Sequence, residues 1–301
     1  MSCPPARPQV PGPGGSQGHR RVLRPQTPEE RLVVALDVPD LDNARALVRA
    51  LRPLVTWFKV GLELYAVAGP VAVEMVKEHG GRVFVDLKLH DIPNTVGRAT
   101  AALARVGADM LSLHAAGGRA MMAEAVAAAA GGPILLGVTV LTSVGEADLA
   151  PLGVARSVVE QVVALARLAR DAGLDGWVAS PREAALLRAE MGPEPVIVTP
   201  GIRPVAGVAS WPGGRAGDDQ VRVATPAMAL AAGADWLVVG RPITRAPDPV
   251  QAARALVEEI QRAMEGGAGG SDGSSGRGGT RASSVGDGGV GMGAAGDRGR
   301  T

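Results

Sequence analysis

Short apolar runs alternate along the chain with longer stretches in which apolar residues recur every three or four positions. The short runs predict β-strands, and the longer stretches predict amphipathic α-helices. The expected strands cover residues 32–37, 57–61, 82–89, 109–116, 133–141, 175–180, 195–201 and 235–241. The expected helices cover residues 41–54, 63–79, 93–105, 118–130, 155–172, 182–191, 226–232 and 249–264.

Eight strands, each followed by a helix, predict a parallel sheet joined by right-handed crossovers. The strands are apolar on both faces, which is typical of parallel strands covered by helices. An open doubly wound sheet is the alternative, but no G-x-G-x-x-G motif follows the first strand to support its dinucleotide-binding form. We therefore predict an α/β fold, a (β/α)8 TIM barrel, as a single domain over residues 29–264.

The two ends of the chain differ from the barrel in composition. Residues 1–28 are rich in Pro, Gly and Arg, and residues 265–301 are mostly Gly, Ser, Ala, Asp and Arg. Neither end can bury enough apolar surface to offset the entropy of ordering it, so we expect two disordered tails. The head lacks the apolar segment of a secretory signal. Its arginines would suit a transit peptide, but its prolines oppose the amphipathic helix that such a peptide forms.

Overall composition argues against several functional classes. The formal net charge of +1 gives no strong field for nucleic acid or for a membrane surface. No apolar run approaches the roughly 20 residues that a membrane span needs. The single cysteine, Cys3, lies in the head, so the barrel has no thiol to form a disulfide. This pattern fits a reducing, cytoplasmic location.

Polar residues gather where the predicted strands end, and this is the edge at which such barrels carry their chemistry. Asp37 ends the first strand, Lys59 lies near the end of the second, and Asp86 and Lys88 lie near the end of the third. A single aspartate there is often a helix cap, and a single lysine often reaches out to water. Their joint placement predicts a site, together with polar or turn residues after later strands: His114, Thr142, Ser143, Pro200, Arg203, Gly240 and Arg241.

The third strand carries the most informative pair. Residues two apart on a strand share a face, so Asp86 and Lys88 are expected to project into the barrel mouth while Leu87 and Leu89 face the helices. The structural alternative is a buried ion pair, but such pairs are costly to desolvate and are weak evidence for stability.

The last two strands predict an anion site. Barrels often bind phosphate at the loops after strands seven and eight. Gly240 lets backbone N–H groups approach an anion, and Arg241 offers a bidentate fork; "TPGIR" (199–203) follows the neighbouring strand. An ordinary turn with a surface arginine is the alternative.

These segments together resemble the bacterial orotidine 5'-phosphate decarboxylase family over residues 30–262. The family motif D-x-K-x-x-D followed by Ile-Pro-x-Thr appears without gaps as Asp86, Lys88, Asp91, Ile92, Pro93 and Thr95. Further similar segments occur in the family's order: "ALD" (35–37), "FKVG" (58–61), "HAAGG" (114–118), "VTVLTS" (138–143), "TPGIR" (199–203), "DQVRVATP" (219–226) and "VVGR" (238–241).

The resemblance implies a role for each matching residue. Asp37 and Lys59 would hold ribose hydroxyls, and Asp86 and Lys88 would flank the reacting carbon. Asp91 and Thr95, beside Ile92, would reach the neighbouring subunit's site in a homodimer. Thr142 and Ser143 would face the pyrimidine, with Pro200 also at the substrate. The phosphate would be covered by Arg203, Gln220, Gly240 and Arg241, and by a closing loop within 202–222, whose part 205–219 is less like the family.

The implied reaction converts orotidine 5'-phosphate to UMP, with Lys88 as the proton donor and with no cofactor. Neighbouring carboxylates favour the charged form of Lys88. The four histidines, at positions 19, 79, 90 and 114, lack metal-ligand spacing. One rival is a Mg²⁺-dependent sugar-phosphate decarboxylase or aldolase of a sister barrel. Another is an inactive phosphate-binding barrel that serves as an interaction module.

Overall fold

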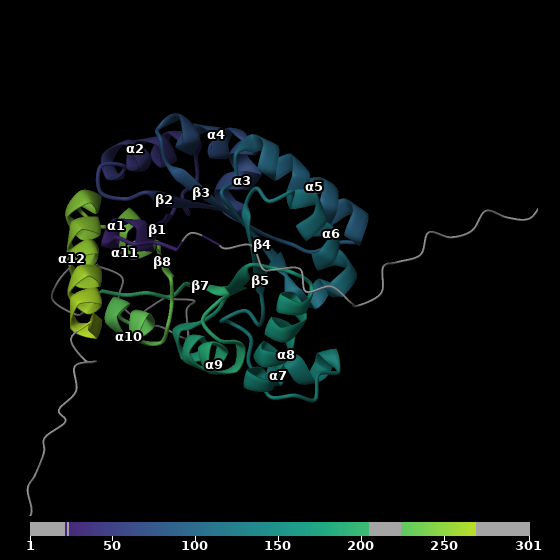
Figure 1. Cartoon of the computed structure of the whole chain (residues 1–301). Helices are drawn as coiled ribbons and strands as arrows, with labels where there is room; N and C mark the ends of the chain where they lie inside the picture. Colours follow the sequence, from purple (N-terminus) through teal and green to yellow (C-terminus); the bar gives the residue numbers. More distant parts are fainter. Residues whose placement is uncertain (1–21, 23, 205–223, 269–301) are drawn as a thin grey trace, which may run out of the picture.

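Residues rich in valine and leucine form eight strands that pair side by side into a closed parallel barrel (Figure 1). The computed structural model describes residues 22, 24–204 and 224–268. Each strand pairs with the next in chain order, and β1 pairs with β8 to close the ring. The strands are β1 (Leu32–Ala35), β2 (Trp57–Gly61), β3 (Arg82–Leu89), β4 (Met110–His114), β5 (Ile134–Val138), β6 (Gly176–Val178), β7 (Val196–Thr199) and β8 (Trp236–Val239).

Helices surround this ring of strands, as the (β/α)8 prediction requires, and that prediction is confirmed (Figure 1). No helix in the described ranges is long and apolar enough to cross a membrane. The helices are α1 (Pro28–Arg31), α2 (Leu41–Leu51), α3 (Leu62–Ala68), α4 (Val71–Glu78), α5 (Pro93–Val106), α6 (Arg119–Ala129), α7 (Glu146–Leu149), α8 (Val158–Asp171), α9 (Pro181–Met191), α10 (Pro226–Ala231), α11 (Arg241–Thr244) and α12 (Pro249–Ala268).

One expected helix is wrong in its extent. The stretch 63–79 forms two helices, α3 and α4, instead of one. Gly69 takes a left-handed φ of 55° at the break, and Pro70 after it has no N–H to donate to a continuing helix. The short helices α7 and α11 were not expected, because each spans only four residues and has no helical period to detect.

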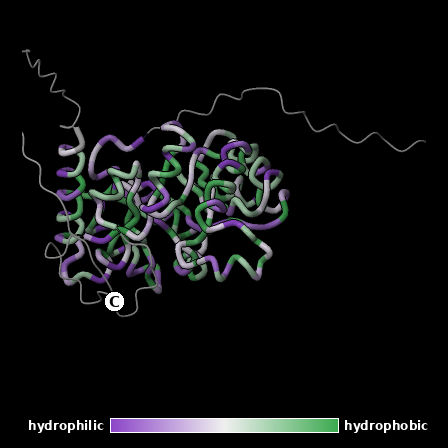
Figure 2. Tube along the Cα trace, turned by 90° about the horizontal axis from the view of Figure 1, so that it is seen from below, coloured by the Kyte–Doolittle hydropathy of each residue, from purple (hydrophilic) through white to green (hydrophobic). Residues whose placement is uncertain are grey.

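The barrel has two apolar layers because strand side chains alternate in direction. Leu32 and Val34 belong to the large outer cluster between strands and helices, whereas Val33 belongs to the cluster inside the barrel. In that inner cluster the rings of Trp57 and Trp236 meet edge to face, with centroids 5.7 Å apart. Figure 2 shows hydrophobic positions through the middle of the trace and hydrophilic ones mostly along its outline. Apolar side chains therefore fill the middle of the barrel.

At the amino-terminal end of the strands, one buried carboxylate is held by two arginines. Arg24 and Arg188 each place a guanidinium nitrogen 2.6 Å from an oxygen of Asp235, the residue before β8. Asp235 also accepts the backbone N–H of Ile197 at 2.8 Å. Val22 packs against the inner apolar cluster. The described fold therefore includes contacts from residues that precede position 29, the expected start of the barrel.

Close packing between strands β6 and β7 gives a stability prediction. A Cβ added to Gly176 would overlap the backbone carbonyl of Val196, which cannot move without disturbing the sheet. We expect Gly176→Ala to lower the free energy of unfolding by about 3 kcal/mol or more. The matched control is Gly266→Ala in α12, where nothing lies within 4 Å and a helical alanine is favourable. Equal melting temperatures for the two variants would contradict this packing.

Candidate active site

A cavity of about 500 Å³ opens at the carboxyl ends of the strands. Its lining includes the apolar residues Ala35, Phe84 and Val238, which also belong to the inner barrel cluster. Around this apolar part stand most of the residues singled out from the sequence: Asp37, Lys59, Asp86, Lys88, Thr142, Pro200, Arg203, Gly240 and Arg241. Residues far apart in the sequence thus meet in one space because their strands end at one rim.

Four charged side chains, which lie on or just after three neighbouring strands, form a row of alternating charge along one side of the cavity. This row consists of Asp37, Lys59, Asp86 and Lys88 and is called the charged wall. Lys59 Nζ lies 3.0 Å from Asp37 Oδ1 and 3.6 Å from Asp86 Oδ2. Lys88 Nζ lies 2.9 Å from the same Asp86 Oδ2. The other oxygen of Asp86, Oδ1, accepts a hydrogen bond of 2.7 Å from Ser112 Oγ. The carboxylate is therefore shared by two ammonium groups and a hydroxyl.

The charged wall also explains why residue 61, in β2, is a glycine. A Cβ at Gly61 would lie 2.8 Å from Lys59 Nζ and 2.9 Å from Asp37 Oδ1. Gly61 pairs with Asp86 in the β2–β3 register, so it stands beside the centre of the cluster. Any larger residue here would displace the ion pair between Lys59 and Asp37.

The backbone of β3 departs from a regular strand at Lys88. Its φ is 52°, in the left-handed region that residues other than glycine rarely adopt. The pairing of β3 with β4 also shifts register between Val85 and Leu89. Leu87 and Leu89 pack against the outer cluster, while Asp86 and Lys88 line the cavity. The charged pair and the leucine pair therefore lie on opposite sides of β3, as expected. A bulge, and not the regular alternation of a strand, produces this arrangement.

The charges in this wall alter each other's protonation. Burial alone would raise the pKa of Asp86, but Lys59, Lys88 and the hydrogen bonds from Lys88 and Ser112 outweigh it and hold that pKa below its usual value. Burial opposes the charge of Lys59 as well, but Asp86 and Asp37 outweigh it and raise the pKa of Lys59. Both effects favour the charged forms of Asp86 and Lys59.

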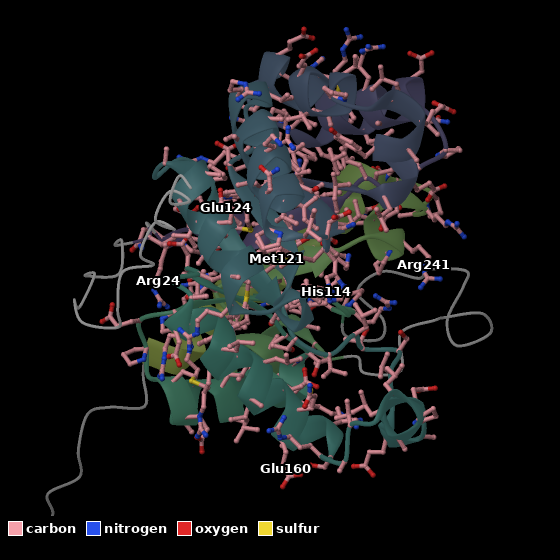
Figure 3. The ribbon with its side chains drawn as sticks, turned by 90° about the vertical axis from the view of Figure 1, so that its right-hand side faces the viewer. Arg24, His114, Met121, Glu124, Glu160 and Arg241 are labelled. Carbon is pink, nitrogen blue, oxygen red and sulfur yellow. The ribbon has the colours of Figure 1, made fainter. Side chains whose placement is uncertain are left out.

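Arginines lie along the part of the cavity formed after β7 and β8. Arg203 follows β7, Arg241 is the first residue of α11 after β8, and Arg245 is the C-cap of that helix; all three line the cavity. Figure 3 shows Arg241 and Arg24 toward opposite ends of the molecule. Arg241 therefore lies far from the amino-terminal end of the strands, where Arg24 pairs with Asp235. Guanidinium groups in this arrangement suit a phosphate, which they can bind through paired hydrogen bonds.

Five of the residues singled out from the sequence are not part of the cavity lining: Asp91, Ile92, Thr95, His114 and Ser143. Asp91 and Ile92 lie on the exposed stretch before α5, Thr95 lies in the exposed first turn of that helix, and Ile92 is 66 % exposed. Asp91 Oδ1 accepts the backbone N–H of Ile92 at 2.6 Å. Ser143 lies just beyond Thr142, which does line the cavity. Gln220 and the loop part 205–219 lie outside the described residues.

Comparison with known proteins gives the family. Residues 30–256 match the model of the orotidine 5'-phosphate decarboxylase / HUMPS family. The chain belongs to this family. The chain is 55 % identical over 242 residues to orotidine 5'-phosphate decarboxylase of Moorella thermoacetica, covering 77 % of this chain and 93 % of that protein. It is 50 % identical over 246 residues to the enzyme of that name from Syntrophotalea carbinolica, covering 79 % and 98 %.

Solved structures agree with this assignment. The crystal structure of orotidine 5'-phosphate decarboxylase from Lactobacillus acidophilus superposes with a TM-score of 0.65 at 35 % sequence identity. The superposition covers 77 % of this chain and 99 % of that one. The resemblance drawn from the D-x-K-x-x-D motif and its companion segments is therefore confirmed at the level of the family.

Several cavity residues of this family member were missed by the sequence reasoning. Glu63, Ser180 and Arg245 line the cavity, and each follows a strand end within a few residues. The strand-end rule could have found them, but they do not belong to a charged motif. Ser112 lies inside β4 and is 1 % exposed. A serine within an otherwise apolar run was a signal that we did not use.

Two histidines lie beside the charged wall. The rings of His90 and His114 are 5.4 Å apart and tilted by 39°. Burial lowers the pKa of His114, and so do His90 and Lys88, against the opposing effect of Asp86. These effects favour the neutral form of His114. Within the described part of the chain, no group of three or more His, Cys, Asp or Glu side chains is placed to hold a metal ion.

Proposed function

We propose that this chain decarboxylates orotidine 5'-phosphate to UMP, in the cytoplasmic de novo synthesis of pyrimidines. The observation that carries the proposal is the Lys88 ammonium, held 2.9 Å from Asp86 in a cavity that also contains three arginines. The Lys88 ammonium can act at a reacting carbon while the three arginines hold a phosphate. Membership in the orotidine 5'-phosphate decarboxylase / HUMPS family supports the same assignment.

The chemical difficulty lies in the carbanion. Breaking the bond between C6 and the carboxylate releases CO2 and leaves an electron pair in an orbital in the plane of the pyrimidine ring. The π system of the ring cannot delocalise that pair, and we propose that no cofactor serves as an electron sink. Stabilisation must then come from charge placed in advance beside C6. The Lys88 ammonium stabilises the pair and donates its proton to C6, and it regains a proton from water.

Asp86 and Lys59 prepare Lys88 for this step. The shared Asp86 oxygen holds Lys88 Nζ at one place, and Lys59 Nζ lies 3.6 Å from that oxygen on the other side. Asp86 also faces the carboxylate of the bound substrate, so departure of CO2 relieves a repulsion between two anions. The alternating charges thus favour the state in which CO2 has left.

The rest of the substrate is bound away from C6. Asp37 and Lys59 hold the ribose hydroxyls, while Thr142, Ser143 and Pro200 face the pyrimidine. The phosphate is covered by Arg203, Gln220, Gly240 and Arg241. Binding energy from the distant phosphate organises the charged wall and therefore contributes to the rate as well as to affinity.

A second subunit completes each site in this proposal. Asp91, Ile92 and Thr95 lie on an exposed stretch next to Lys88 in the chain but outside its own cavity. In a homodimer, Asp91 and Thr95 enter the cavity of the partner. Ile92, which is 66 % exposed in the single chain, would be buried between the subunits in this arrangement.

The family description also covers relatives of a different kind, so a Mg²⁺-dependent sugar-phosphate decarboxylase or aldolase is the second candidate. Such an enzyme stabilises an enediolate through its metal. Loss of orotidine 5'-phosphate absorbance in the presence of EDTA separates the two. Turnover that requires added Mg²⁺, or that occurs only on a sugar phosphate, would favour the second candidate.

Lys88→Ala tests the proton donor. We expect turnover of orotidine 5'-phosphate to fall by at least 10³-fold, because both charge stabilisation and proton donation are lost. The matched control is Lys77→Ala, which removes a lysine that pairs with Asp109 outside the cavity and should retain near-normal turnover. Circular dichroism of both variants reports the fold. Near-normal turnover of Lys88→Ala would contradict the assignment.

Arg241→Ala tests the phosphate site. We expect KM for orotidine 5'-phosphate to rise by about 10- to 100-fold, since charged hydrogen bonds to the phosphate are lost. The nucleoside orotidine has no phosphate, so its slow turnover should be the same in Arg241→Ala and in the unmodified protein. Arg262→Ala on α12 is the surface control. An equal effect on both substrates would place Arg241 elsewhere than at the phosphate.

Subunit mixing tests the shared site. Asp91→Ala and Lys88→Ala homodimers are each expected to be nearly inactive. Heterodimers made from the two contain one cavity with both native residues, so about a quarter to a half of the native activity should return, depending on how randomly the subunits mix. Differently tagged chains isolate the heterodimer for the assay. An inactive, purified heterodimer would show that each cavity works with residues of one chain.

A further inference from the structure

The bulge that carries Asp86 and Lys88 has one residue opposite it. In the pairing of β3 with β4, Val85 is opposite Leu111 and Leu89 is opposite Leu113. Between these pairs β3 has three residues, 86 to 88, whereas β4 has only Ser112. The side chain of Ser112 is therefore the one group of β4 that stands across from the bulged segment.

The Ser112 hydroxyl bonds to both charged residues of the bulge. Its Oγ donates to Asp86 Oδ1 at 2.7 Å and accepts the backbone N–H of Lys88 at 3.0 Å. Ser112 is 1 % exposed, so water does not compete for these bonds. A hydroxyl can donate one hydrogen bond while it accepts another, and this is the combination that the site requires.

We propose that Ser112 is a positioning residue for the decarboxylation, which fixes the Asp86 carboxylate and the Lys88 backbone relative to each other. The proposal rests on the roles given above to Asp86 and Lys88. No role follows for Ser112 from contact with substrate, because it does not line the cavity. Its effect passes through the two residues that do.

The backbone conformation of Lys88 shows why hydrogen bonds are needed to hold the bulged segment. A left-handed φ is unfavourable for a lysine by about 1–2 kcal/mol, so residue 88 relaxes toward an extended conformation unless something holds it. Loss of the hydroxyl leaves the Lys88 N–H and Asp86 Oδ1 without this buried partner. The ammonium then loses its fixed place beside the carboxylate.

The arginines lie elsewhere in the cavity, after β7 and β8, so Ser112 should not influence phosphate binding. This separation gives the inference a kinetic signature that a general loss of stability does not produce. The chemical step slows, whereas binding of the phosphate and ribose is retained.

The experiment measures kcat for orotidine 5'-phosphate and the dissociation constant of UMP in purified full-length Ser112→Ala. We expect kcat to fall by about 10- to 100-fold, as for loss of a hydrogen bond to a charged group, with UMP affinity within about threefold of native. A matched pair, Ser112→Thr and Ser112→Val, has the same shape with and without the hydroxyl. The threonine variant should be at least tenfold faster than the valine variant.

The control for buried hydroxyls is Thr100→Ala. Thr100 lies in α5, is fully buried and is outside the cavity, so this variant loses a hydroxyl without touching the charged wall. Its kcat should remain native. A kcat of Ser112→Ala within twofold of native would overturn the proposal. So would equal rates for the folded threonine and valine variants, or a weakening of UMP binding that matches the loss of kcat.

Lys88→Ala in the same assay separates this inference from the proposed function. If Lys88→Ala loses turnover and Ser112→Ala does not, only the role of Ser112 fails. If Lys88→Ala keeps its turnover, the role of Lys88 in the reaction fails, and the positioning role fails with it.

Discussion

The structure of the site depends on one buried carboxylate. Removing Asp86 from water is unfavourable unless its charge is matched, and the match comes from Lys59 on β2, Lys88 on β3 and the Ser112 hydroxyl on β4. Three neighbouring strands must therefore end in a fixed register around a single side chain. Gly61, opposite Asp86, is part of this constraint because a side chain there would enter the ion pair.

Much of the fold followed from the sequence because a barrel repeats one simple pattern. The strands 57–61 and 82–89 have the bounds that their apolar runs predicted, and Asp86 and Lys88 line the cavity at the carboxyl ends of the strands. Alternation along a regular strand predicts Lys88 on the cavity side, where it lies, but the strand is bulged at this point. A bulge depends on how many residues two neighbouring strands place between shared pairs, and a single strand's sequence does not contain that number.

The same limit explains why Ser112 escaped notice. Charged residues are conspicuous in apolar strands, whereas a serine can be a neutral filler or a hydrogen-bonding partner. Only the position of β4 against the bulge distinguishes the two. The helix break after Ala68 is easier to predict from the sequence, since Gly69 and Pro70 are adjacent and both disfavour a continuous helix.

The arginine pair at the base has a consequence for how this domain can be cut. Arg24 and Arg188 share Asp235, so a recombinant fragment that starts at position 29 would keep every strand and lose one of the two arginines that pair with this carboxylate. The remaining charge would sit at the foot of β8, the strand that leads up to Gly240 and Arg241. A domain boundary chosen from apolar content alone thus removes a short polar segment whose Arg24 pairs with the Asp235 carboxylate at the amino-terminal end of the strands.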